Sequence, residues 1–243
     1  MNLRELVYGQ LGSFTGKQIL RPGLCSRIAL GVLLVASLNC SGAFSVRSEE
    51  SSPTIRIRVF NYATATPTTV LAAERSAGKI LRDAGLNVVW LQCRVGNSTD
   101  DRSAACQQPL LPTEVLLRVL SDHSRTGVPD DAFGFAVPPI LASVYYEHAA
   151  RLARIEGHEV TPILACVMVH ELGHLMLGQR SHSESGIMQG HWVRRHLQLI
   201  NWDALKFTPE QSRLINAEAQ RRMMLKTSRI IVAESLNNGP ATD

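Results

Sequence analysis

The chain has 243 residues, of which 45% are hydrophobic and 19% are charged. This composition is typical of a globular protein with one sizeable core, and it excludes a wholly disordered chain. The formal net charge is +4, but residues 1–43 hold four basic residues against one acidic residue, which leaves +1 for the remainder. A nearly neutral body gives no electrostatic footprint for nucleic acid, so nucleic-acid partners are not expected.

Residues 1–43 have the pattern of a secretory signal. Arg27 is followed by an uncharged apolar run at 28–38 and then by small residues at 41–43 that fit a cleavage site. The run is shorter than the ~20 residues that a membrane-spanning helix needs. We therefore expect an exported protein, secreted or extracytoplasmic, with a linker at 44–53. An uncleaved N-terminal anchor is the alternative, and only that alternative would place the chain at a membrane.

The body of the chain opens with a strand, a helix and a second strand. Apolar and basic residues alternate over 54–60, the period of a half-buried strand. Apolar residues recur at helical spacing over 67–84, and Gly85 follows as a C-terminal cap would. The apolar segment 86–91 predicts the second strand.

Two cysteines bracket the polar loop that follows. Cys93 and Cys106 enclose residues 94–105, and a disulfide closing this loop would stabilise the fold by roughly 3 kcal/mol. Two unrelated thiols are the alternative. A disulfide would agree with export, because disulfides persist in oxidising compartments.

Three further strands are predicted at 114–120, 132–137 and 141–146. The second of these lies between Pro129 and Pro138, which have no N–H to donate to a neighbouring strand. The segment 132–137 should therefore be an edge strand, which could bind an extended peptide by strand addition.

A helix is predicted over 161–177, with Thr161 as its N-cap and Pro162 at its first position. Gly178 should end it. The segment is apolar almost all round, which predicts a buried helix.

The last predicted helix begins with the capping-box pattern from Thr208 to Gln211 and continues to about Met224. Residues 227–243 are predicted to form a flexible tail. Strands first and a buried helix later favour one α+β domain over residues 54–226.

The buried helix contains His170-Glu171-Leu172-Gly173-His174. Two histidines four positions apart share one helix face, so both rings can bind one metal ion. Glu171 points about 100° away around the helix, where a carboxylate can reach water instead of the metal. This division of roles is what metal-assisted hydrolysis requires. Histidines that only form hydrogen bonds in the core are the alternative.

A catalytic zinc site needs three protein ligands and one open position. His182 follows Gly178 by four residues, where the chain can turn back toward the metal, and is the favoured third ligand. The alternatives that stay open are His191, His196, Glu184, Glu210 and Glu218. Cys166, one turn before His170, is expected to be a buried structural thiol.

After His182 the chain continues to Gly186-Ile187-Met188, and Trp192 follows. Together with the histidine helix and its terminal glycine, this order resembles the metzincin zinc metalloproteases. It is also similar to small exported bacterial proteins regarded as peptidases, which carry a comparable His-Ser-x-x-Gly-Ile-Met stretch before a tryptophan. The spacing departs from the metzincin pattern: the glycine lies four positions after the second histidine, and the third histidine lies four positions after the glycine, where metzincins have three in each case. The tyrosine that some metzincins use downstream is also missing.

The resemblance implies a zincin-like fold, a mixed twisted sheet with a buried metal-binding helix and a C-terminal helix. It implies that His170, His174 and His182 hold one zinc ion per chain. By the same resemblance Glu171 is the general base, and Met188 is the methionine of a turn beneath the metal.

The expected function is a zinc-dependent endopeptidase that acts on a peptide or protein outside the cytoplasm. A non-catalytic secreted metal-binding module and a metal-dependent amidase acting on cell-wall peptides are the alternatives. Trp192 is expected to pack in the core beside the site. A basic cluster offers candidates for stabilising the transition state, with a solvated patch as the alternative: His191, Arg194, Arg195 and His196.

Overall fold

The computed structural model describes residues 52–94, 101–122, 132–192, 200 and 204–237. All of them belong to one compact unit formed by residues 48–243. The predicted signal at 1–43 lies outside the described residues and stays a prediction.

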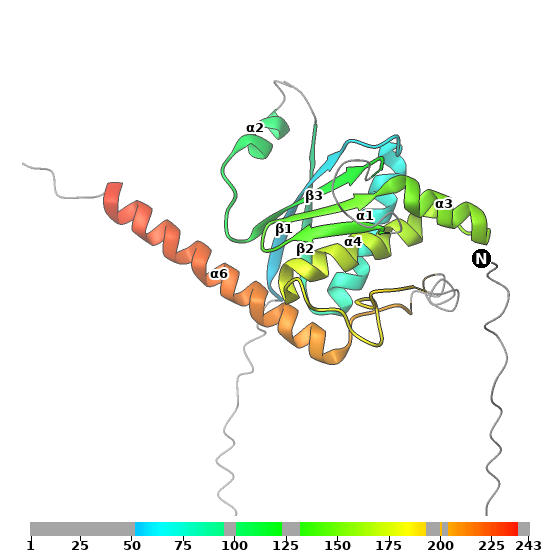
Figure 1. Cartoon of the computed structure of the whole chain (residues 1–243). Helices are drawn as coiled ribbons and strands as arrows, with labels where there is room; N and C mark the ends of the chain where they lie inside the picture. Colours follow the sequence, from blue (N-terminus) through cyan, green and yellow to red (C-terminus); the bar gives the residue numbers. More distant parts are fainter. Residues whose placement is uncertain (1–51, 95–100, 123–131, 193–199, 201–203, 238–243) are drawn as a thin grey trace, which may run out of the picture. The chain divides into compact units, whose positions relative to one another are not determined.

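Five strands form one mixed sheet, in the order β2-β1-β3-β5-β4 (Figure 1). The first four in this order are parallel neighbours, whereas β4 runs antiparallel to β5. The predicted edge strand is confirmed, because β4 lies at the end of the sheet and Pro138-Pro139 follow it directly. The strands are β1 (Thr54–Asn61), β2 (Asn87–Cys93), β3 (Glu114–Leu120), β4 (Gly134–Val137) and β5 (Leu141–Tyr145).

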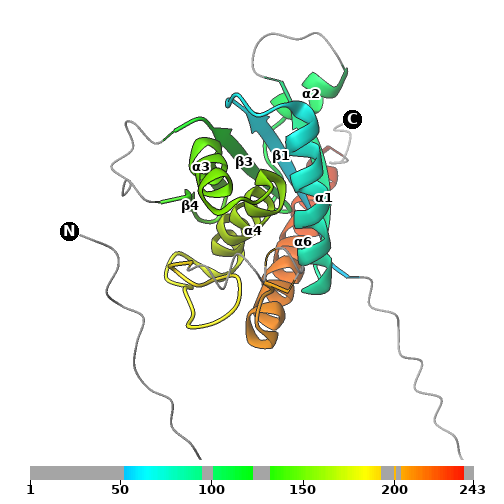
Figure 2. The same ribbon diagram turned by 90° about the vertical axis from the view of Figure 1, so that its right-hand side faces the viewer.

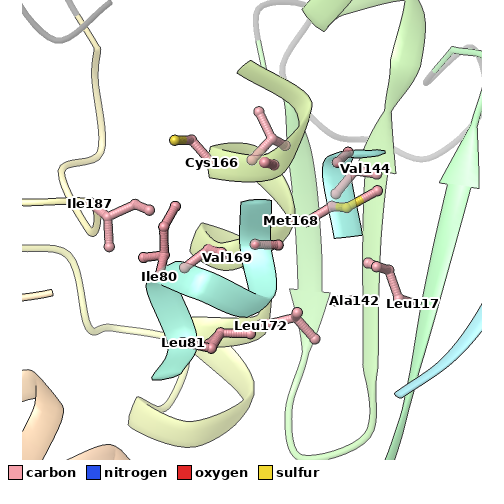
Figure 3. Packing of buried hydrophobic residues seen from close by; sticks show 14 of the residues in the cluster. Ile80, Leu81, Leu117, Ala142, Val144, Cys166, Met168, Val169, Leu172 and Ile187 are labelled. Atoms are coloured by element: carbon pink, nitrogen blue, oxygen red, sulfur yellow. The ribbon is translucent and has the colours of Figure 1, made fainter. Parts of the chain in front are cut away.

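Helices α1 and α4 pack against each other and against the sheet (Figure 2). Their apolar side chains meet those of the central strands, and Figure 3 shows Leu81 of α1, Met168 and Leu172 of α4, and Val144 of β5 in this core. The helices are α1 (Pro67–Asp83), α2 (Asp101–Gln107), α3 (Tyr146–Glu156), α4 (Val160–Leu177) and α6 (Pro209–Asn237). One mixed sheet with helices packed on it agrees with the predicted α+β class.

Helix α4 is the centre of this packing. It is long and apolar enough to cross a membrane, yet 72% of it is buried inside the unit. The sequence is apolar almost all the way around this helix, and the burial that this pattern predicts is therefore confirmed. Gly178 ends the helix with a φ of +94°, a conformation that side chains disfavour.

The predicted start of α4 is wrong by two residues. The N-cap is Glu159, whose side chain makes no capping hydrogen bond, instead of Thr161. Pro162 still lies in the first turn, where a helical N–H would have no intrahelical partner, so proline is tolerated there.

Helix α3 was not predicted. The chain leaves β5 at Tyr145 and enters α3 at Tyr146, without a side-chain cap at the junction. Two tyrosines favour a strand locally, and the tertiary packing of α3 on α4 overrides that preference. The short helix α2, which contains Cys106, was also not predicted.

The capping box of α6 is confirmed. The Thr208 N–H donates to Gln211 Oε1 at 3.0 Å, and the Gln211 N–H donates to Thr208 Oγ1 at 3.2 Å. The helix does not end near Met224, however, but continues to Asn237. The Thr227 and Ser228 hydroxyls bond to carbonyls one turn earlier and leave the helical backbone intact.

The predicted disulfide is present between Cys93 and Cys106. Beyond it, the buried Arg58 donates to the Gln108 carbonyl at 2.6 Å and pairs with Glu114 at 2.5 Å. This arginine ties the loop after the disulfide to the sheet.

Candidate metal centre

Helix α4 and the loop after it bring three imidazoles together. His170 and His174 lie one turn apart on α4, with their Nε2 atoms 3.2 Å from each other. His182 Nε2 lies 3.3 Å from that of His170 and 3.2 Å from that of His174. In the part of the chain that the structure describes, these three side chains form the group whose ligand atoms are close enough to hold a metal ion.

This triangle fits zinc. With Zn–N bonds of about 2.0–2.1 Å, tetrahedral geometry requires nitrogens about 3.3–3.4 Å apart. The three observed separations of 3.2–3.3 Å agree with that requirement to about 0.1–0.2 Å. All three histidines line the cleft described below, so a zinc ion held by them could keep the open fourth position that a catalytic site requires.

Backbone carbonyls orient two of the rings. His170 Nδ1 lies 2.8 Å from the Ile187 carbonyl, and His174 Nδ1 lies 3.2 Å from the Gly178 carbonyl and 3.0 Å from Ser181 Oγ. A carbonyl only accepts, so each Nδ1 carries the proton and each Nε2 presents a lone pair to the triangle. Sequence reasoning missed these partners, because a backbone carbonyl has no sequence signature.

Burial keeps these histidines in the form that binds metal. Desolvation lowers the pKa of His170 to about 4, against a smaller opposing effect of its bond to the Ile187 carbonyl. Desolvation also lowers the pKa of His174. Both rings are therefore neutral near pH 7, and no proton has to leave before a metal ion binds.

The rival third ligands lie elsewhere. Glu210 pairs with Arg213, and Glu218 pairs with Arg221 and Arg222, all on α6. Three other predicted site residues, Arg194, Arg195 and His196, lie outside the described residues. Glu184 and His191 are both exposed; His191 lines the cleft described below, apart from the three-histidine group.

Met188 lies directly beneath α4. It is fully buried, and a Cβ added at Gly173, between the two helical histidines, would lie 2.5 Å from its Sδ atom. Gly173 is thus the residue that allows Met188 to approach the helix. The turn before it has Gly186 at a φ of +78°, and the Ile187 N–H donates to the Lys206 carbonyl at 2.8 Å. The same turn therefore supports both the helix and, through Ile187, a histidine ring.

Glu171 is 6% exposed and lies against the edge strand. A Cβ added at Gly134 of β4 would lie 2.8 Å from Glu171 Cγ and 3.0 Å from Cδ, so only glycine leaves room for this carboxylate. Burial raises the pKa of Glu171 to about 8. A cation bound at the three histidines would favour the ionised form of the carboxylate.

The three histidines and Glu171 open into a cleft of about 730 Å³. Its walls come from the edge strand, one face of α3, α4 and the loop beyond Met188. Trp192 packs against the core beside the site, as expected, although it is only partly buried. It also forms part of this wall, with its ring edge-on to His170 at 5.9 Å between centroids. Besides residues of α4 and of the loop that carries His182, the cleft is lined by Ala132–Ala136, His148, Arg151, Leu152, Ile155, Gln189, Gly190, His191 and Trp192.

The sequence matches neither a protein-family model nor a curated protein. Among solved structures, the chain is similar to archaemetzincin from Methanopyrus kandleri, with 18% identity, a TM-score of 0.47, and coverage of 73% of this chain and 99% of that one. It is also similar to a zinc-dependent peptidase from Methanocorpusculum labreanum, with 16% identity, a TM-score of 0.47, and coverage of 66% and 100%. Similarities with TM-scores below 0.5 do not indicate an activity for this chain. Its activity has to be inferred from the site itself.

Proposed function

We propose that this chain is a zinc-dependent endopeptidase in which His170, His174 and His182 hold one zinc ion and Glu171 is the general base. One observation carries the proposal: three Nε2 atoms 3.2–3.3 Å apart open, together with a buried carboxylate, into a cleft bounded by an edge strand. The buried carboxylate of Glu171 in the same cleft favours hydrolysis over metal binding alone, because metal-assisted hydrolysis needs a base beside the metal.

Zinc at this site would lower the pKa of water and polarise the substrate carbonyl. The protein's own part is proton transfer. Glu171 takes the proton from the attacking water and passes it to the nitrogen of the departing amine. Because Glu171 points about 100° away from His170 around the helix, its carboxylate serves the water and leaves metal binding to the rings.

The edge strand would bind the substrate backbone. The Tyr145 N–H donates to the Phe133 carbonyl at 2.8 Å, and the register pairs Gly134 with Val144. In an antiparallel ladder, hydrogen-bonded residues alternate with residues whose backbone groups face outward. Gly134 and Ala136 therefore turn their N–H and C=O groups away from β5, and both line the cleft. An extended peptide can add to the sheet there as a further strand.

We also propose that the enzyme acts outside the cytoplasm. The signal pattern of residues 1–43 supports this location, and so does the disulfide between Cys93 and Cys106, because structural disulfides are rare in reducing compartments.

The test compares Glu171→Gln with Glu184→Gln, a change of the same kind at an exposed site beyond the third histidine. Zinc content by elemental mass spectrometry and cleavage of a mixed peptide library are measured for both. We expect about one zinc per chain in each variant, and a loss of cleavage of about 10²–10⁴-fold in Glu171→Gln alone. Full turnover by Glu171→Gln would refute the general base.

A His182→Ala variant tests the third ligand. Zinc should be lost or strongly weakened in this variant, because a catalytic zinc needs three protein ligands. Zinc retained at wild-type affinity would assign the third ligand elsewhere. Zinc bound by the wild type without cleavage of any peptide would favour the non-catalytic metal-binding module, and cleavage confined to cell-wall peptides would favour the amidase.

A further inference from the structure

His148 is a buried histidine outside the three-histidine group. It lies on α3, is 4% exposed, and forms part of the cleft wall. Its Nδ1 lies 2.6 Å from the Ala132 carbonyl, and its Nε2 lies 3.0 Å from Asp122 Oδ1. Both ring nitrogens are thus held by oxygen atoms of other segments, which fixes the ring in one orientation.

The two oxygens belong to the two sides of the connection between β3 and β4. Asp122 follows β3, which ends at Leu120, and Ala132 precedes β4, which begins at Gly134. The start of β4 is therefore anchored twice, since the Phe133 carbonyl accepts from the Tyr145 N–H of β5 and the Ala132 carbonyl bonds to His148 of α3. The second anchor fixes the edge strand relative to a helix as well as to the sheet.

A chain of rings continues from this anchor to the metal centre. Phe133 packs edge-on to His148, with 6.4 Å between ring centroids, and stacks on Trp192 at 6.3 Å. Trp192 in turn packs edge-on to His170 at 5.9 Å. A displacement of the Ala132–Phe133 segment would therefore change both the edge strand and the wall beside a histidine of the metal centre.

We propose that His148 is a positioning residue for substrate binding. By holding the Ala132 carbonyl, it keeps the outward backbone groups of Gly134 and Ala136 at a fixed position beside the three histidines, ready to pair with an extended peptide. Preorganised groups bind more tightly because less conformational entropy is lost on binding. The inference rests on the proposed peptidase function, but the anchoring of β4 can be measured without it.

Two substitutions separate the two hydrogen bonds. The amide nitrogen of asparagine occupies nearly the position of a histidine Nδ1, whereas that of glutamine reaches the position of Nε2. His148→Asn can therefore keep the bond to the Ala132 carbonyl, and His148→Gln can keep only the bond to Asp122. Both variants leave a buried polar side chain on α3, so each controls for the folding effect of the other.

The first measurement is amide hydrogen exchange over residues 132–137 in the full-length zinc-loaded protein. We expect faster exchange there in His148→Gln and wild-type exchange in His148→Asn. The second measurement is the binding of two inhibitors, followed by calorimetry. Acetohydroxamate contacts only the metal centre, whereas a trialanyl hydroxamate also extends along β4. His148→Gln should bind the tripeptide compound about tenfold more weakly, as expected for the loss of one buried hydrogen bond, with zinc content and acetohydroxamate affinity unchanged.

Equal exchange rates in the two variants would overturn the proposal, and so would a difference in exchange without a difference in affinity for the tripeptide compound. In the peptidase assay the effect should fall on KM more than on kcat. Failure of the proposed function would look different, because the wild type itself would then bind no zinc or cleave no peptide.

Discussion

Gly173 offers the sharpest test of how the fold supports the metal centre. A Cβ at this position would lie 2.5 Å from Met188 Sδ and 3.0 Å from Phe207 Cε1. Met188 is fully buried and Phe207 is 8% exposed, so neither side chain can move into solvent. Overpacking of this kind costs about 1–3 kcal/mol, and the better helix propensity of alanine offsets about 1 kcal/mol of it. We expect Gly173→Ala to lower the free energy of unfolding by up to about 2 kcal/mol.

The same substitution should weaken zinc binding. Met188 is joined directly to Ile187, whose carbonyl lies 2.8 Å from His170 Nδ1, so a displaced methionine disturbs the orientation of that ring. Loss of such support typically lowers metal affinity about 10–100-fold. The zinc dissociation constant is measured by competition with a chelator, and the free energy of unfolding by urea titration of the metal-free protein.

Gly78→Ala on α1 is the matched control. Its nearest contact would be Arg82 Nη1 at 3.3 Å, the end of a flexible side chain. This variant should be neutral or more stable by up to about 1 kcal/mol, with unchanged zinc affinity. If Gly173→Ala loses stability but binds zinc as tightly as the wild type, the turn at Met188 does not transmit packing to the metal centre and the reasoning is refuted.

Two further substitutions test buried carboxylates. Desolvation raises the pKa of Glu74 to about 7, so folding favours its protonated form, and stability should fall by about 3 kcal/mol as the pH rises from about 4.5 to above 7. Urea titrations across this range should show that slope in the wild type and lose much of it in Glu74→Gln; parallel curves would contradict the effect of burial. Gly134→Ala places a Cβ against Glu171 and the Ser143 carbonyl, so kcat should fall at least about tenfold with zinc retained. Unchanged kcat would show that the edge strand does not position the carboxylate.

Periodic sequence patterns predicted the parts of the fold that depend on local burial. The alternation at 54–60 became β1, and the apolar run at 161–177 became the buried core of α4. Helix α3 lacks such a signal, because its buried positions include His148, a polar residue whose partners are distant in sequence. Helix α6 continues past Met224 for a related reason: its polar residues form hydrogen bonds within the helix, so they do not end it.

The candidate site also has parts that the sequence predicts and parts that it does not. Spacing on a helix fixes the shared face of His170 and His174, so these two positions could be placed in advance. The carbonyls of Ile187 and Gly178, which orient the two histidine rings, could not be predicted. Every residue has a carbonyl, and only the folded chain shows which one lies near a ring.

The third histidine depends on loop conformation, which has no period. The span from His174 to His182 is two residues longer than in the metzincin pattern, yet the two Nε2 atoms lie 3.2 Å apart. Gly178 turns the chain out of α4 with a positive φ, and the ring of His182 packs against Gly190, where a Cβ would lie 3.1 Å from Nδ1. Gly178 therefore sets the direction in which the chain leaves α4, and Gly190 leaves the space that the ring of His182 occupies. It follows that zinc affinity should depend on these glycines as well as on the three rings, although neither glycine has a ligand atom in the triangle.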